Sequence, residues 1–124
     1  MNVAIVGASS DREKFGNKAV RAYLKQGHRV FPVNPTAKMI ENLQVYPDLK
    51  EIPAPLEVIS IYLPPAITEK ILDELSTLEP KPETIYVNPG AESEEVEKKA
   101  HDLHLPVKFA CSIRAIGEDP ANYT

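Results

Sequence analysis

The sequence predicts an α/β fold: a single doubly wound domain in which helices cover both faces of a five-stranded parallel sheet. Short β-branched runs alternate with stretches of helical period, which is the order of elements in a parallel sheet. The runs Val3–Val6 and Val58–Ile61 are almost continuously apolar, as strands buried on both faces are. The length of 124 residues suits one core, so we expect one domain over residues 1–124.

Five strands are expected, each in a short apolar or β-branched run. They are residues 2–7, 29–33, 57–62, 84–87 and 106–110. The first helix is predicted from about Asn17 to Gln26, because apolar residues recur there at helical spacing and Gly27 can end a helix.

Two further helices follow from proline and charge placement. The second begins at Pro64-Pro65, because a proline in the first turn costs no hydrogen bond. Its expected packing residues are Ile67, Ile71, Leu72, Leu75 and Leu78. The third spans about residues 93–103, with acidic side chains at its N-terminal end where the helix dipole favours negative charge.

Residues 34–56 are rich in proline and are predicted to form a crossover with a short turn near Asp48-Leu49. Because crossovers between parallel strands are right-handed, the simplest strand order is 3-2-1-4-5, counted along the chain. The order reverses beside strand 1. Open α/β sheets bind ligands at such a switch point, here at the carboxyl ends of strands 1 and 4.

Composition excludes several classes of partner. The net charge of -4 comes from 14 basic and 18 acidic residues spread along the chain, whereas nucleic-acid binding needs a dense positive face. The longest apolar runs are about five residues, against roughly twenty for a membrane span, and no signal peptide or anchor is expected. The single cysteine, Cys111, cannot form an internal disulfide, which fits a cytoplasmic protein.

The loop from Gly7 to Asn17 is a candidate phosphate loop. Gly7 allows a tight turn after the first strand, Ser9 and Ser10 add hydroxyl donors, and a helix that follows presents free N–H groups to an anion. The full GxGxxG pattern is absent, since only Gly7 and the distant Gly16 are present. An ordinary strand-to-helix turn with surface serines is the alternative.

The segment after strand 2 bears on which nucleotide is bound. NAD-binding domains usually carry an acidic residue there for the ribose hydroxyls, but this chain has Asn34-Pro35 and then Lys38. A phosphorylated ribose is therefore favoured over that of NAD. Coenzyme A and NADP both carry such a phosphate, so charge does not separate them. The alternative interpretation is that Asn34-Pro35 only makes a turn.

Several stretches occur in an order that is typical of a known family. They are Val6-Gly7-Ala8-Ser9 with Lys14 downstream, Val30-Phe31-Pro32-Val33-Asn34-Pro35, Val45-Tyr46-Pro47-Asp48-Leu49, Ile61-Tyr62-Leu63-Pro64-Pro65 and Asn88-Pro89-Gly90-Ala91-Glu92. The chain resembles the small bacterial CoA-binding proteins with a Rossmann-like fold, which in turn resemble the CoA-binding domain of the succinyl-CoA synthetase alpha subunit. It departs from the family at Asn88, where glutamine is common, and before Cys111, where a charged residue is usual.

The resemblance implies a site for coenzyme A or an acyl-CoA in three parts. The pyrophosphate would lie on the first loop, with Lys14 as a charge partner, and the adenosine end near the segment after strand 2. The pantetheine would follow the loops after strands 3 and 4. The implied residues are Gly7, Ser9, Ser10, Lys14, Phe15, Gly16 and Asn17; Asn34, Pro35 and Lys38; and Leu63, Pro64, Pro65, Asn88, Pro89 and Gly90.

The expected function is a stand-alone CoA-binding module, such as a carrier, sensor or partner subunit, without catalysis by the chain itself. No catalytic residue and no metal site are expected. His101 and His104 have no third ligand at suitable spacing, and Cys111 is read as a packing residue. The alternatives are an NADP-linked oxidoreductase or another nucleotide-binding Rossmann protein.

Overall fold

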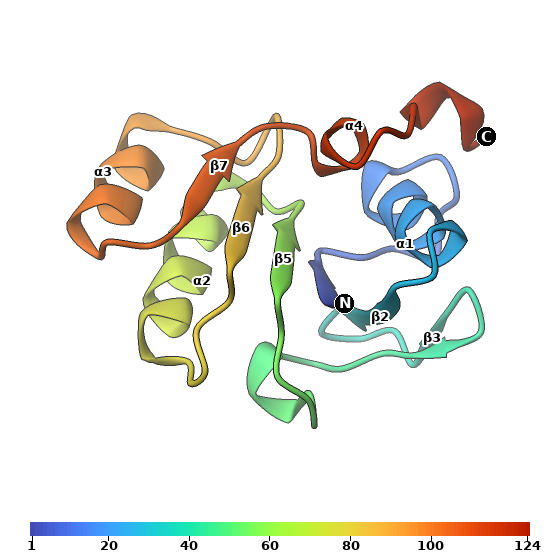
Figure 1. The fold of residues 1–124 in the computed structure, drawn as a ribbon, viewed down its shortest axis with the longest axis horizontal. Helices are drawn as coiled ribbons and strands as arrows, with labels where there is room; N and C mark the ends of the chain where they lie inside the picture. Colours follow the sequence, from blue (N-terminus) through green and yellow to red (C-terminus); the bar gives the residue numbers. More distant parts are fainter.

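A parallel sheet forms the centre of the computed structural model, which describes residues 1–124. Its strands lie in the order β2-β1-β5-β6-β7 and all neighbouring pairs are parallel. The bounds are β1 (Asn2–Val6), β2 (Arg29–Val33), β5 (Val58–Ile61), β6 (Thr84–Val87) and β7 (Val107–Phe109). The central strands β1 and β5 are buried almost throughout, because helices cover both faces of the sheet (Figure 1).

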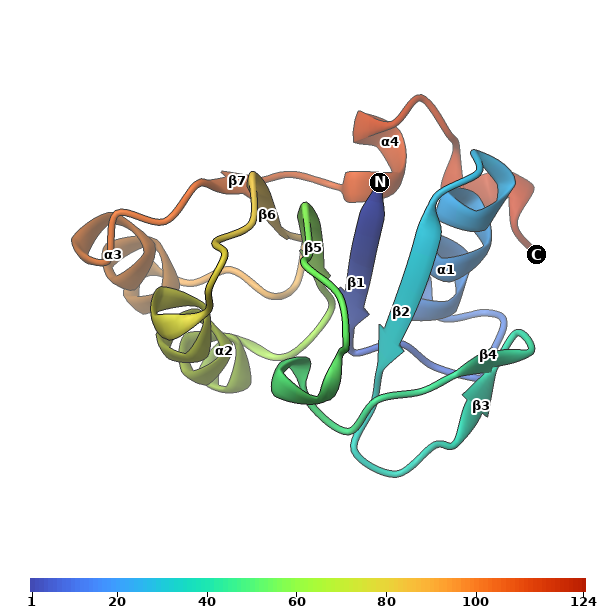
Figure 2. The same ribbon diagram turned by 60° about the horizontal axis from the view of Figure 1, so that its bottom comes forward.

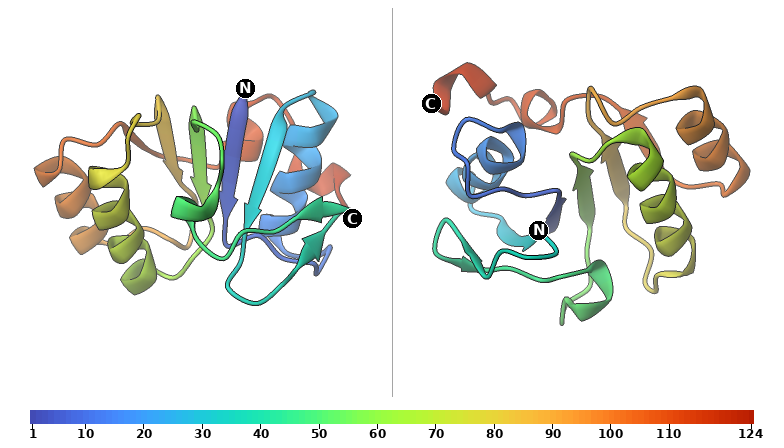
Figure 3. Two further views of the ribbon diagram at one scale, coloured as in Figure 1. Left: turned by 90° about the horizontal axis from the view of Figure 1, so that it is seen from below. Right: turned by 180° about the vertical axis from the view of Figure 1, so that it is seen from behind.

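Each face of the sheet has its own set of helices (Figures 2 and 3). Each face also has its own apolar cluster. On one face lie α1 (Phe15–Lys25), α4 (Ser112–Ala115) and the 3₁₀ turn η2 (Pro120–Asn122), and on the other lie the 3₁₀ turn η1 (Leu49–Glu51), α2 (Pro65–Thr77) and α3 (Glu94–Asp102). Alternate side chains of β1 enter the two clusters: Val3 and Ile5 face α1, and Ala4 and Val6 face α2. The predicted doubly wound architecture is therefore confirmed.

The helices and strands lie close to the predicted positions. All five expected strands are present, and the three expected helices correspond to α1, α2 and α3. The turn expected near Asp48-Leu49 is η1, which Asp48 caps by accepting a hydrogen bond from the Glu51 N–H. The small hairpin of β3 (Met39–Ile40) and β4 (Leu43–Gln44), the helix α4 and the turn η2 were not predicted, because each is too short to show a periodic pattern.

The 3-2-1-4-5 pattern holds, but a different segment occupies the third place. Tyr46 forms a parallel bridge with Val33: its N–H donates to Pro32 O, and the Asn34 N–H donates to Tyr46 O, both at 3.0 Å. This segment lies beyond β2, where we expected residues 57–62.

Residues 57–62 instead form β5 on the other side of β1, which corrects the assignment. Every residue of β5 is buried, and such an apolar strand removes more surface from water in the middle of a sheet than at its edge. The switch point is consequently between β1 and β5, rather than between β1 and residues 84–87.

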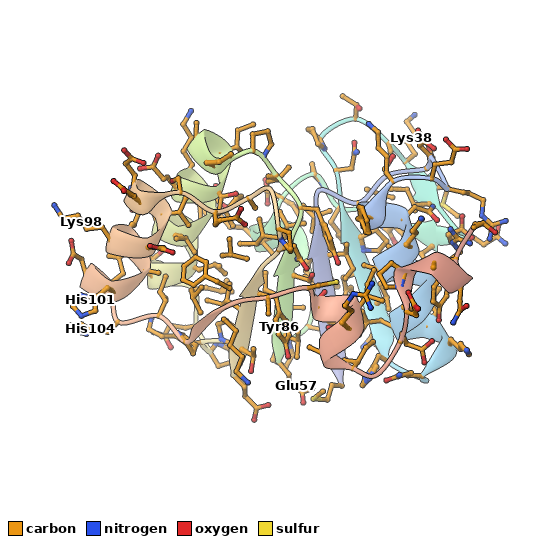
Figure 4. The ribbon with its side chains drawn as sticks, turned by 90° about the horizontal axis from the view of Figure 1, so that it is seen from above. Lys38, Glu57, Tyr86, Lys98, His101 and His104 are labelled. Atoms are coloured by element: carbon orange, nitrogen blue, oxygen red, sulfur yellow. The ribbon has the colours of Figure 1, made fainter.

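The two histidines considered as metal ligands lie on the surface. His101 and His104 are exposed at the end of α3, at the margin of the molecule (Figure 4). No group of three or more metal-ligating side chains comes together in the structure. None of the helices has the length and apolar character that crossing a membrane requires.

Candidate functional site

Three hollows lie in a row where β1, β2, β5 and β6 end. Their volumes are about 470, 350 and 60 Å³. The first and second share the lining residues Gly7, Lys14, Tyr62 and Leu63, and the second and third share Phe15, Tyr62 and Pro89. The hollows therefore form one continuous groove.

Another hollow, of about 520 Å³, lies between residues 49–56 and 78–80, next to the amino ends of β5 and β6. Ligands of open α/β sheets bind at the carboxyl ends of the strands. The groove at the carboxyl ends is therefore the candidate site.

The turn after β1 is held by contacts between backbone atoms. Gly7 has a φ of +88°, and a Cβ atom there would lie 2.4 Å from Tyr62 O. A Cβ atom on Gly16 would lie 2.3 Å from Gly7 O. Only glycine fits at either position, and the first turn of α1 is thereby brought directly against the end of β1.

This close packing leaves several backbone donors free on the loop after β1 and on the first turn of α1. The N–H groups of Ser9, Ser10, Phe15 and Gly16 form no hydrogen bond within the protein. The first turn of α1 contains no acidic residue, and Lys14 lines both hollows. Free N–H groups at a helix N-terminus together with a lysine make an anion-binding arrangement.

Asn17 holds this loop in place through hydrogen bonds. It is fully buried, and its Nδ2 donates to Ser9 O at 2.9 Å and to the Glu41 carboxylate at 3.1 Å. Its Oδ1 accepts from Arg21 Nε at 2.8 Å. The amide of Asn17 is thus used within the protein, and the residue does not line the groove.

Asn34 connects the loops that follow β1 and β2. Its Nδ2 donates to Ala8 O at 2.9 Å, and its Oδ1 accepts from the N–H groups of Thr36 and Ala37, both at 2.9 Å. Asn34 lines the first hollow, but its side chain already has protein partners. Asn34 therefore makes a turn with the residues that follow it, and it also lies at the groove; both had been considered for this residue.

Asn88 organises a buried polar cluster at the other end of the groove. Its Nδ2 donates to Ser60 Oγ and Ile61 O, both at 2.9 Å, and its Oδ1 accepts from the Ser112 N–H at 2.8 Å. The Ser112 hydroxyl lies 2.6 Å from Ser60 Oγ and 3.1 Å from the Tyr62 hydroxyl. Burial raises the pKa of Tyr62 to about 12, so its phenol is protonated at neutral pH.

Most of the predicted site residues meet in the groove. Those lining it are Gly7, Ser9, Lys14, Phe15, Gly16, Asn34, Pro35, Leu63, Pro64, Pro65, Asn88, Pro89 and Gly90. Ser10 is exposed on the loop, and Lys38 is exposed at the margin of the molecule (Figure 4). Ser10, Asn17 and Lys38 line none of the three hollows.

The sequence analysis missed one wall of the groove. Ile67, Ile71 and Glu74 line the first hollow from α2, although the two isoleucines were expected to pack in the core. Leu72 and Leu75 form the buried stripe instead, and Ile67 is 44 % exposed. Ile67 and Ile71 form a second apolar stripe beside the stripe of Leu72 and Leu75. The presence of two stripes was the only sequence signal that one of them does not face the core.

Cys111 lies at the far end of the groove. It is half-buried and lines the third hollow together with Phe15, Tyr62, Asn88 and Pro89. The backbone of the next residue, Ser112, is held by Asn88. Cys111 therefore packs against the apolar cluster beside α1, as expected, and also borders the groove.

Comparison with known proteins identifies similar sequences and folds. The sequence model of a family described as "CoA binding domain" matches residues 1–115. The chain is 26 % identical over 116 residues to the acetate–CoA ligase [ADP-forming] II subunit alpha of Pyrococcus furiosus, covering 93 % of this chain and 25 % of that one. It therefore spans about a quarter of the length of this relative.

Several solved structures share the fold and exceed 25 % identity, and two of them illustrate the similarity. A conserved hypothetical protein from Pyrococcus furiosus superposes with a TM-score of 0.80 and 32 % identity, covering 87 % of this chain and 91 % of that one. The dinucleotide-forming acetyl-coenzyme A synthetase 1 of Ca. Korarchaeum cryptofilum, in complex with phosphate and ADP, has a TM-score of 0.74 and 28 % identity, covering 89 % of this chain and 25 % of that one.

Replacing Gly7 by Ala should destabilise the protein more than replacing Gly27 by Ala. Both glycines have positive φ, but a Cβ at Gly27 would meet no atom within 4 Å. The backbone conformation alone costs roughly 1–2 kcal/mol. At Gly7 the contact with Tyr62 O should lower the free energy of unfolding by about a further 1–3 kcal/mol. Urea unfolding of the two variants measures this difference. Equal losses in the two variants would show that the close contact is unimportant.

Replacing Asn34 by Asp should lower the free energy of unfolding by about 1–3 kcal/mol at neutral pH, because a carboxylate oxygen would face Ala8 O without a proton to donate. Asn42→Asp, at an exposed turn position with φ 64°, is the matched control and should change stability by less than about 0.5 kcal/mol. Protonation at acidic pH restores a donor, so the difference between the variants should shrink there. A difference independent of pH would contradict this account.

Proposed function

The chain belongs to the CoA binding domain family, and on that premise we propose that it binds coenzyme A or an acyl-CoA along the three-part groove. The observation that carries the proposal is the order of chemistries along this groove. A hollow of about 470 Å³ with both apolar and polar walls leads to a cluster of free N–H groups beside Lys14, and then to two smaller hollows. A nucleotide joined through a diphosphate to a long, thin arm has the same order of parts.

The pyrophosphate is assigned to the loop between Gly7 and Gly16. Its charge would be met by the free N–H groups, the N-terminal end of the α1 dipole and Lys14. Ser9 Oγ accepts from the Asp11 N–H at 3.0 Å, so its own hydroxyl proton is available to a phosphate oxygen. This region lies where the first and second hollows join.

The pantetheine arm is assigned to the second and third hollows. Their walls come from Phe15, Pro64, Pro65 and Pro89, which offer flat apolar surface to a chain of methylene and amide groups. The thiol or thioester end would then lie near Cys111. The adenosine is assigned to the first hollow, beside Asn34 and Pro35, with Lys38 as a solvent-exposed charge near the ribose phosphate.

The proposed role is a binding module that acts as a carrier, sensor or partner subunit. The acetate–CoA ligase subunit is about four times as long as this chain, so its activity is a property of a longer protein. No catalysis is proposed for the residues of this groove. An NADP-linked oxidoreductase is the alternative, and the ligand series below separates the two.

Coenzyme A should raise the melting temperature, because a ligand that binds only the folded state stabilises it by mass action. At about 100 times the dissociation constant, the gain is about 2.7 kcal/mol. The test is thermal unfolding with coenzyme A, dephospho-CoA, NADP and NAD in parallel, followed by calorimetric titration. A shift with NADP and none with millimolar coenzyme A would replace the proposed function by the alternative.

Lys14→Gln should weaken coenzyme A binding by about tenfold or more, which corresponds to about 1.4 kcal/mol. The loss should shrink as salt is added, because ions screen the attraction between the lysine and the diphosphate. Lys70→Gln removes an exposed charge from α2 that lines none of the hollows, and it should leave the affinity unchanged. Equal effects of the two variants would remove Lys14 from the site.

A further inference from the structure

Glu74 stands out among the residues of the first hollow. Its Oε2 is buried and has no hydrogen-bond partner, and the residue forms no ion pair. A carboxylate oxygen that is removed from water without a donor is unfavourable by itself. Because Glu74 lines the first hollow, a ligand there can bring a donor to its carboxylate group.

The surroundings of Glu74 define the kind of donor. Leu49, Leu63, Ile67 and Ile71 line the same hollow and present apolar surface. A flat group with apolar faces and an N–H donor at its edge fits this combination. The adenine ring has that form, because its exocyclic amino group donates two hydrogen bonds in the plane of the ring.

A second carboxylate lines this hollow and opposes a phosphate there. Asp48 accepts from the Glu51 N–H through Oδ1 at 3.1 Å, so it is fixed at the start of η1. Asp48 and Glu74 repel phosphate from the side of this hollow formed by η1 and α2, whereas Lys14 attracts it at the junction with the next. The charges therefore orient a nucleotide with its base toward α2.

We propose that Glu74 recognises the amino group of adenine and so selects the base of the bound nucleotide. This inference rests on the proposed function and adds to it a residue that determines specificity. Hypoxanthine carries a carbonyl oxygen in place of the amino group. That oxygen would face the Glu74 carboxylate as a second acceptor, so the hypoxanthine nucleotide binds less well.

The test is calorimetric titration with coenzyme A and with its deaminated analogue, in which hypoxanthine replaces adenine. The wild-type protein should prefer coenzyme A by about tenfold or more, equivalent to about 1.4 kcal/mol. Glu74→Gln should reduce the preference to about threefold or less, because a glutamine amide can accept from an amino group and can also donate to a carbonyl oxygen.

Two controls separate base recognition from general effects. Glu69→Gln makes the same chemical change on α2 at a residue that lines none of the hollows, and it should keep the wild-type preference. Pantetheine 4′-phosphate lacks the nucleotide, so Glu74→Gln and the wild-type protein should bind it equally. A loss of affinity for this fragment as well would assign Glu74 a purely structural role.

The outcomes distinguish this inference from the proposed function. If the wild-type protein binds coenzyme A and its deaminated analogue equally, or if Glu74→Gln keeps the preference, Glu74 does not read the base although the protein binds coenzyme A. If the wild-type protein binds neither ligand, both proposals are wrong. Should Glu74→Gln fail to fold, the wild-type preference alone decides, because equal binding still overturns the inference.

Discussion

The site depends on one steric constraint: the backbone of Gly7 lies against the carbonyl of Tyr62, and the backbone of Gly16 lies against the carbonyl of Gly7. These contacts bring the end of β1, the end of β5 and the start of α1 to one place. The free N–H groups of the loop and the first two hollows exist because these three elements meet there. Larger side chains at either glycine would separate them.

A second layer of polar groups keeps the loops around that point in place. Asn17, Asn34 and Asn88 each bind a backbone carbonyl from another loop or strand end and also accept at least one hydrogen bond. Strand ends carry backbone groups that the sheet does not pair, and a side-chain amide can satisfy both a donor and an acceptor. The groove is therefore shaped by side-chain amides, of which Asn17 and Asn88 are buried, while backbone N–H groups, Lys14 and apolar side chains remain without such partners along it.

Sequence periodicity was sufficient to predict the strands and the three long helices. A continuously apolar run such as Val3–Val6 can bury all its side chains only in a strand that is covered on both faces. Periodicity also indicated the edge of the groove, because loops after parallel strands meet at one edge of the sheet, while the groove residues after β5 and β6 were implied by the family resemblance. It could not decide that residues 57–62 pair with β1, since a right-handed crossover can reach either edge of the growing sheet. The Tyr46 bridge and the groove wall of α2 depend on contacts between segments distant in sequence.

Tyr62 lines all three hollows, and the chain contains no tryptophan. One aromatic side chain therefore borders each part of the groove, from the wide end to the narrow end near Cys111. Its phenol stays protonated across the neutral range because burial raises its pKa to about 12. Its ultraviolet absorption overlaps that of the other tyrosines of the chain, which has five in all. Replacing Tyr62 by Phe would isolate the ultraviolet signal of the one ring that borders every part of the groove.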